Sequence, residues 1–159
     1  NPDSERAARV VAINNAAGME GVIATDIRRE VWRKLMTNIS GNPIAALTRL
    51  AGKNIADVTG LDKLAMKLIE EALNVAAADG CDLRSEIMPS SIVSPARGRF
   101  GGKPSMLQDV EAGRALEVDA LMGQVQDFAR QHGVVVPTID AVCALLAGLD
   151  LSLRLASQR

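Results

Sequence analysis

The spacing of apolar residues along most of the chain predicts α-helices. Residues 62–79 are the clearest example, because their apolar side chains recur every three or four positions and would share one helical face. On the same grounds we expect helices over residues 3–17, 26–40, 42–50, 83–93, 106–112, 116–131 and 139–156. Gly41 should end the second of these, and Thr138 should cap the last. This pattern predicts a mainly α fold.

Residues 19–25, with the sequence MEGVIAT, interrupt the helical pattern. The segment is short and rich in β-branched residues, which is typical of a strand. A helix, a glycine turn at Gly18 and a strand together form a fragment of an alternating α/β pattern. Since one strand cannot form a sheet, either this strand pairs with another molecule or the rest of its sheet lies outside this sequence.

The composition narrows the class of protein. The 159 residues are 48% apolar but only 2% aromatic, so we expect a core of aliphatic side chains. The net charge of −1, without a long basic run, argues against a nucleic-acid partner. No apolar run reaches the roughly 18 to 20 residues that span a bilayer, and no secretory signal opens the chain, so we expect neither membrane insertion nor export.

The two cysteines, Cys81 and Cys143, lack the spacing of a metal site. We therefore expect no metal and two free thiols, as in a reducing compartment. The sequence thus predicts a cytoplasmic protein.

Three polar residues follow one side of the helix that starts near residue 26. Lys34, Asn38 and Asn42 recur at intervals of four in EVWRKLMTNISGNP, so Lys34 and Asn38 should face the same way, whereas Pro43 disfavours helical geometry at Asn42 and can turn its side chain aside. Each has an ordinary structural explanation, because a helical lysine is usually solvated and an asparagine before Pro43 suits a helix cap. Spacing alone therefore favours a structural role.

A second polar group lies in SMLQDVEAGRALEVD. It opens with Ser105 and places Glu117 twelve residues later. The segment also holds Asp109, Glu111 and Asp119, and we expect most of these acids to be solvated.

Two blocks of sequence carry a family resemblance. In DIRREVWRKLMTNISGNPIAAL, a tryptophan and a lysine are followed by two asparagines and a proline. In PSMLQDVEAGRALEVDALMGQVQDFARQHGVVVP, a serine-methionine-leucine opening precedes a glutamate, and His-Gly stands before a proline. In this order and spacing, the blocks resemble the C-terminal part of the ketopantoate reductase family, NADPH-dependent reductases of 2-oxo acids.

The resemblance implies roles for five residues. The family's catalytic lysine corresponds to Lys34, and its two substrate-holding asparagines correspond to Asn38 and Asn42. Its substrate-binding serine corresponds to Ser105, and the glutamate that positions the lysine and touches the cofactor corresponds to Glu117. These residue types suit the chemistry, because an ammonium can protonate the oxygen of a 2-oxo acid while amides and a hydroxyl bind the substrate.

The resemblance also implies domains. Residues 26–159 should form a helical domain like the C-terminal domain of 6-phosphogluconate dehydrogenase, which binds substrate and often mediates homodimers. Residues 1–25 should be the remnant, a helix and a strand, of an N-terminal nucleotide-binding Rossmann domain. The GxGxxG turn that binds a dinucleotide is absent, so NADPH would be bound mainly by that missing domain. This chain alone is expected to be inactive.

Two departures from the family pattern bear on the substrate. The family often has a threonine at the position of Leu116, and some members bind substrate through an asparagine at the position of Gly102, beside the basic Lys103. The resemblance favours ketopantoate, in pantothenate biosynthesis, as the substrate. The alternatives are a related NAD(P)-dependent 2-hydroxyacid dehydrogenase with another substrate, and a non-catalytic helical dimerisation module.

Overall fold

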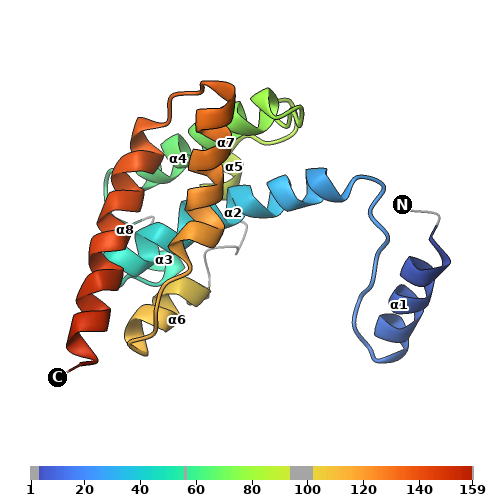
Figure 1. Cartoon of the computed structure of the whole chain (residues 1–159), viewed down its shortest axis with the longest axis horizontal. Helices are drawn as coiled ribbons and strands as arrows, with labels where there is room; N and C mark the ends of the chain where they lie inside the picture. The colour runs from blue at the N-terminus through green and yellow to red at the C-terminus, as the bar shows by residue number, and fades with distance from the viewer. Residues whose placement is uncertain (1–3, 56, 94–101, 159) are drawn as a thin grey trace.

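The computed structural model describes residues 4–55, 57–93 and 102–158. All regular structure in these residues is helical (Figure 1), which confirms the predicted mainly α fold. The elements are α1 (Glu5–Ala16), α2 (Ile27–Thr48), α3 (Gly52–Ile55), α4 (Leu61–Ala78), α5 (Pro89–Val93), α6 (Ser105–Glu111), η2 (Asp119–Gly123), α7 (Gln124–His132) and α8 (Pro137–Ala156). The element η2 is a π-helix that runs directly into α7.

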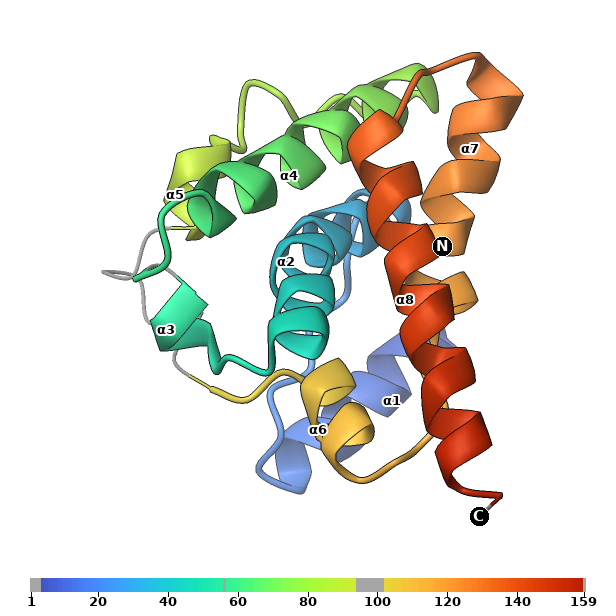
Figure 2. The same cartoon turned by 90° about the vertical axis from the view of Figure 1, so that its left-hand side faces the viewer.

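Helix α2 runs through the centre of the bundle. Figure 2 looks along this helix and shows α4, α6, α7 and α8 around it. Its buried face carries Met36, Ile39 and Ile44, which are at most 1% exposed. Each buried side chain of this kind contributes roughly 1.5 to 3 kcal/mol. The core is aliphatic, as predicted, and the aromatic rings of Trp32 and Phe128 pack together with centroids 5.7 Å apart.

Helix α2 continues through Pro43, so the predicted break at Gly41 was wrong. Proline deprives the carbonyl four residues earlier of its helical N–H partner. Gly41, Pro43 and Ile44 are nevertheless all buried, and the packing of this face outweighs the lost hydrogen bond. The helix ends instead at Arg49, whose φ of 61° is left-handed and whose N–H donates to the carbonyl of Ala45.

Helix α1 lies apart from the bundle and is joined to α2 by an extended segment (Figure 1). It is capped locally by the Ser4 hydroxyl, which accepts a hydrogen bond from the N–H of Ala7, and none of its residues is buried. The strand predicted for residues 19–25 was wrong. A strand needs a neighbour for its backbone hydrogen bonds, and the described part of the chain offers none.

Two other helices begin later than predicted. The helix expected over residues 83–93 is confined to α5, because Pro89 suits a first helical turn but not a helix interior. The helix expected from residue 116 begins at Asp119, so Glu117 stands in the loop between α6 and η2. By contrast, the helix predicted over residues 62–79 was confirmed, as α4, to within one residue at each end.

The start of α8 is capped by a distant side chain. Thr138, the predicted cap, makes no capping hydrogen bond with its side chain. Instead the buried carboxylate of Glu71, on α4, accepts the N–H of Thr138 at 3.0 Å and the N–H of Ile139 at 3.0 Å. Glu71 thereby satisfies two of the N–H groups that every helix start leaves unpaired, and it joins α4 to α8.

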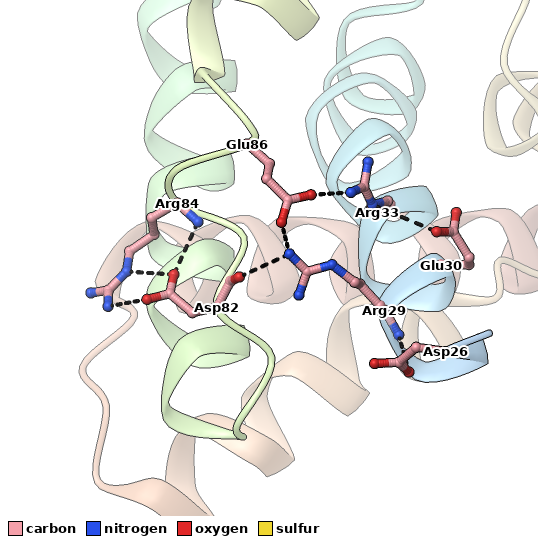
Figure 3. A network of polar contacts seen from close by, with 7 residues as sticks. All are labelled: Asp26, Arg29, Glu30, Arg33, Asp82, Arg84 and Glu86. Atoms are coloured by element: carbon pink, nitrogen blue, oxygen red, sulfur yellow. Dashed lines mark hydrogen bonds and ion pairs between the residues drawn. The ribbon is translucent and has the colours of Figure 1, made fainter. Parts of the chain in front are cut away.

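The first turns of α2 are also fixed by charged groups, which Figure 3 shows. Arg29 and Arg33 both form ion pairs with Glu86, which lies in the segment between α4 and α5. Arg29 also donates to the carbonyl of Asp82, and its N–H binds the capping carboxylate of Asp26 at 3.1 Å. Partly exposed pairs contribute little individually, but this set connects α2 to the 82–86 segment at several points.

The buried carboxylate of Asp79 connects α4 to α2 and α7. It ends α4, and its carboxylate pairs with Arg28 and accepts a hydrogen bond from Trp32 Nε1 at 3.2 Å, both on α2. His132 Nε2, in the last turn of α7, lies 3.3 Å from the same carboxylate. Burial raises the pKa of Asp79, but the hydrogen bonds from Arg28, Trp32 and His132 outweigh it and lower the pKa below its usual value.

The two cysteines lie in the packed part of the bundle. Cys81 and Cys143 are free thiols, as predicted, and both are buried. Burial, with the nearby carboxylates of Asp140 and Asp119, raises the pKa of the Cys143 thiol to about 11.

Within the described residues, we find no helix with the length and apolar content required to cross a membrane.

Candidate active site

The predicted polar stripe lies on one continuous helix. Because α2 runs through Pro43, Lys34, Asn38 and Asn42 keep helical spacing and succeed one another along the same side. Lys34 is exposed, and both asparagines are half-buried. The opposite face of α2, with Met36 and the other core residues, anchors this stripe against rotation.

Four of the five predicted site residues line one small cavity of about 110 Å³. Asn38 and Asn42 come from α2, Ser105 from the first position of α6, and Glu117 from the loop before η2. The remaining lining residues are Met106, Asp109 and Leu121. The fold therefore brings together two sequence blocks that are more than sixty residues apart in the chain, which the sequence pattern could only suggest.

Lys34 lies one turn before this cavity. It lines an apolar groove of about 540 Å³ between α2 and the η2–α7 segment, whose walls include Leu35, Leu121 and Phe128. Asn38 lines both the groove and the cavity, so the two spaces adjoin at this residue. Within the described residues, no ion pair or hydrogen bond engages the Lys34 ammonium, and Lys34 and Glu117 are not in contact as an ion pair.

Lys34 also borders a second, more polar cleft. This cleft has a volume of about 690 Å³ and lies between α2 and the segment that leads into α5. Arg33, Glu86 and Ser91 are among its lining residues. Lys34 thus lies between a polar cleft and an apolar groove, and a molecule bound in either space could contact its ammonium.

Packing of α6 sets the direction of its site residues. Met106, Leu107 and Val110 are buried against the core, which leaves Ser105 at the cavity. Asp109, expected to be solvated, lines the cavity as well and is paired with Arg114 through Oδ1 at 2.7 Å. Its position one turn after Ser105 on a helix was the signal that could have identified it.

The described residues fit only one end of a nicotinamide dinucleotide. The apolar walls of the groove suit a flat ring, and Lys34 and Asn38 supply polar groups at its edge. The N-terminus of α2 is unsuited to a pyrophosphate, because Asp26 already occupies the N–H of Arg29 there. In the residues that the structure describes, no three metal-binding side chains come together.

Comparison with known proteins identifies a family for most of the chain. The family model described as "Ketopantoate reductase PanE/ApbA C terminal" matches residues 26–150. The curated 2-dehydropantoate 2-reductase of Mesorhizobium japonicum is 38% identical over 151 residues, which make up 93% of this chain and 46% of that protein. The chain thus spans about half the length of the curated relatives that it matches.

Solved structures agree with this family. The 2-dehydropantoate 2-reductase of Methylococcus capsulatus superposes with a TM-score of 0.80 at 28% identity, over 94% of this chain and 48% of that protein. A D-mandelate dehydrogenase, solved with NADH and anilino(oxo)acetate, shares the fold with a TM-score of 0.83 at 19% identity, over 96% of this chain and 50% of that protein.

Proposed function

Because this chain belongs to the ketopantoate reductase family, we propose that it is the substrate-binding domain of an NADPH-dependent enzyme that reduces ketopantoate to pantoate. The observation that supports this most strongly is the cavity that joins Asn38, Asn42, Ser105 and Glu117 beside Lys34. These are the residues that the family pattern marks, and the fold gathers them from three separate segments. The reaction would serve pantothenate biosynthesis in the cytoplasm.

The proposed mechanism gives each residue one task. The nicotinamide cofactor, when bound, supplies a hydride for carbon 2 of the 2-oxo acid. The Lys34 ammonium donates a proton to the ketone oxygen and stabilises the negative charge that develops there. The amides of Asn38 and Asn42 and the hydroxyl of Ser105 hold the substrate's polar groups without adding charge next to the ammonium. Glu117 would direct the ammonium in the complex with substrate and would touch the cofactor.

The N-terminal segment fits a different part of such an enzyme. Residues 1–25 precede the family match, and the helix within them buries none of its residues. We propose that they belong to a nucleotide-binding domain that holds most of the NADPH, and that residues 26–159 form the helical domain. The 159-residue chain alone is then expected to show no turnover.

The far side of the bundle suits a second copy of the chain. On one face of α8, Leu151 and Leu155 lie one turn apart, and each is 53% accessible. We propose that this face contributes to a homodimer. Sedimentation of the wild-type protein beside Leu151→Asp tests this, because a dimer through this face should dissociate in the variant, and an unchanged oligomeric state would contradict it.

A second 2-oxo acid remains the main alternative, since a D-mandelate dehydrogenase shares the fold. The residues that depart from the family pattern do not line the cavity. Lys103 turns instead to Glu111 on α6, at 2.6 Å, and Gly102 is exposed. Neither position brings a new charge to the cavity, which favours ketopantoate over a substrate with an additional acidic group.

A substrate panel tests the proposal. NADPH oxidation should be measured with the longer protein that carries a nucleotide-binding domain before residue 26, using ketopantoate, pyruvate, 2-oxoisovalerate and phenylglyoxylate. We expect the highest kcat/KM with ketopantoate. A higher value with another member of the panel would identify a different 2-hydroxyacid dehydrogenase, and no turnover with any of them would favour a non-catalytic dimerisation module.

A further inference from the structure

Asp150 is a buried carboxylate on α8 to which the proposed reaction gives no task. Its Oδ1 accepts a hydrogen bond from the N–H of Leu116 at 2.8 Å, across 34 positions of sequence. Its Oδ2 pairs with Arg154, one turn further along α8, at 2.7 Å. Leu116 directly precedes Glu117, so Asp150 binds the main chain next to a residue that lines the cavity.

The other described hydrogen bonds of this loop are local. Arg114 binds α6 through both its side chain and its N–H. The carbonyl of Glu117 accepts the N–H of Leu121, at 3.3 Å, where η2 begins to turn. Among the described hydrogen bonds and ion pairs of residues 114–118, the bond to Asp150 is the one that connects the loop to α8. This bond therefore ties the main chain beside Glu117 to α8.

We propose that Asp150 is a positioning residue, which holds Glu117 at the cavity by fixing the main chain at Leu116. The proposal rests on the role proposed above for Glu117. A carboxylate acceptor makes a stronger hydrogen bond with an N–H than a neutral one, and an unpaired N–H in a half-buried position is costly. Without the Asp150 acceptor, the loop would shift until the N–H of Leu116 regains a partner. A shift of about 1 Å at a reacting group can reduce the rate by up to about a hundredfold.

The contact involves the main chain at Leu116 and not its side chain. The leucine that replaces the family's frequent threonine therefore leaves this contact possible. The contact instead depends on an oxygen acceptor at position 150. This dependence separates two variants: Asp150→Ala removes the acceptor, whereas Asp150→Asn keeps an oxygen of the same reach.

The first test compares kcat for NADPH oxidation with ketopantoate in the longer protein. We expect Asp150→Ala to lower kcat about tenfold or more and Asp150→Asn to stay within about threefold of wild type. Arg154→Gln is the matched control, since it removes the ion pair but leaves the Leu116 bond, and it should leave kcat unchanged. Equal losses in the alanine and asparagine variants, or a loss in Arg154→Gln, would overturn the proposal.

A double-mutant cycle separates positioning from general destabilisation. If Asp150 acts through Glu117, Asp150→Ala should cause little further loss of kcat in a Glu117→Gln background. A loss of the same factor in both backgrounds would contradict the proposal, because a merely structural defect adds to the loss at Glu117. Thermal unfolding of each variant verifies that the protein is folded at the assay temperature.

A readout that does not require turnover keeps this inference separate from the proposed function. Amide hydrogen exchange at Leu116 can be measured in the 159-residue chain. We expect exchange to be at least tenfold faster in Asp150→Ala than in wild type or Asp150→Asn. Unchanged exchange would overturn the role of Asp150 even if the enzyme is active, whereas faster exchange in a protein that reduces no substrate would mean that the proposed function alone has failed.

Discussion

Asp79, at the end of α4, binds side chains from two other helices. Its buried carboxylate receives Arg28 and Trp32 from α2 and His132 from α7. All three partners favour the ionised form, so its pKa is lower in the folded protein than in the unfolded chain. A carboxyl with a lowered folded-state pKa stabilises the fold above its usual pKa, and this contribution is lost as the pH falls below it.

Asp79→Asn should therefore destabilise the protein at pH 7 and weaken its sensitivity to acid. We expect a decrease of about 1 to 3 kcal/mol in the free energy of unfolding at pH 7, because Arg28 and Trp32 lose a buried, charged acceptor. Below about pH 4 the difference between wild type and variant should shrink. Urea denaturation at a series of pH values measures both effects.

Asp82→Asn is the control for this experiment. Asp82 is exposed, and Arg84, only two residues away, lowers its pKa to about 2 through hydrogen bonds. A pair so close in sequence can persist in the unfolded chain. Removal of the Asp82–Arg84 pair should therefore change the pH dependence of the free energy of unfolding less than Asp79→Asn does. If the two variants lost the same free energy of unfolding, the buried contacts of Asp79 would not be the cause of the destabilisation.

The buried thiol of Cys143 should be unreactive in the folded protein. Its pKa of about 11 leaves almost no thiolate at pH 8, and the side chain is 7% exposed. We expect a disulfide reagent such as Ellman's reagent to label Cys143 only after urea is added. Fast labelling of the native protein would show that α8 opens readily, contrary to the packing described above.

The sequence marked individual candidate site residues but not their partners. Lys34, Asn38 and Asn42 were marked by an interval of four, and Ser105 and Glu117 by family resemblance. Asp150 carried no such signal, because its partner is a backbone N–H 34 positions away and depends on how α8 packs. Local spacing reports faces of helices, whereas contacts between elements are decided by tertiary structure.

At the scale of elements, α8 is capped by a side chain from another helix. Glu71→Ala should leave the N–H groups of Thr138 and Ile139 without this partner, and we expect a loss of about 1 to 3 kcal/mol in the free energy of unfolding. Glu71→Gln keeps an acceptor and should lose less. Urea denaturation measures both variants.

Thr138→Ala is the matched control for the cap. Its hydroxyl makes no capping bond, so the change should stay within about 0.5 kcal/mol of wild type. A larger loss in Thr138→Ala than in Glu71→Ala would restore the interpretation based on sequence, in which Thr138 caps the helix.

The errors in the predicted elements share a physical cause. The apolar period located α4 correctly, because a long amphipathic helix carries its own signal. Helix α2 was predicted to end at Gly41, just before Pro43, and burial of both residues reverses that local preference. The strand at residues 19–25 had a suitable local sequence, but a strand forms only beside another strand. Local preferences failed where long-range contacts decided the outcome.

At the scale of the whole molecule, the bundle should not depend on its N-terminal segment. Helix α1 buries no residue and lies apart from the other helices (Figure 1). A chain that begins at Asp26 should therefore unfold within about 0.5 kcal/mol of the 159-residue chain, because few contacts are lost. Circular dichroism during urea denaturation measures this. A large loss of stability would show that residues 1–25 are part of the helical domain.

The central claim is that Lys34 supplies the proton in the reduction of a 2-oxo acid. The most direct measurement is the kcat of NADPH oxidation with ketopantoate for Lys34→Ala in the longer protein, beside Lys67→Ala, which removes an exposed lysine of α4 that pairs only weakly with Glu70. We predict that Lys34→Ala lowers kcat about 10²- to 10⁴-fold and that Lys67→Ala leaves it unchanged. A Lys34→Ala enzyme that retains the wild-type kcat would contradict the account.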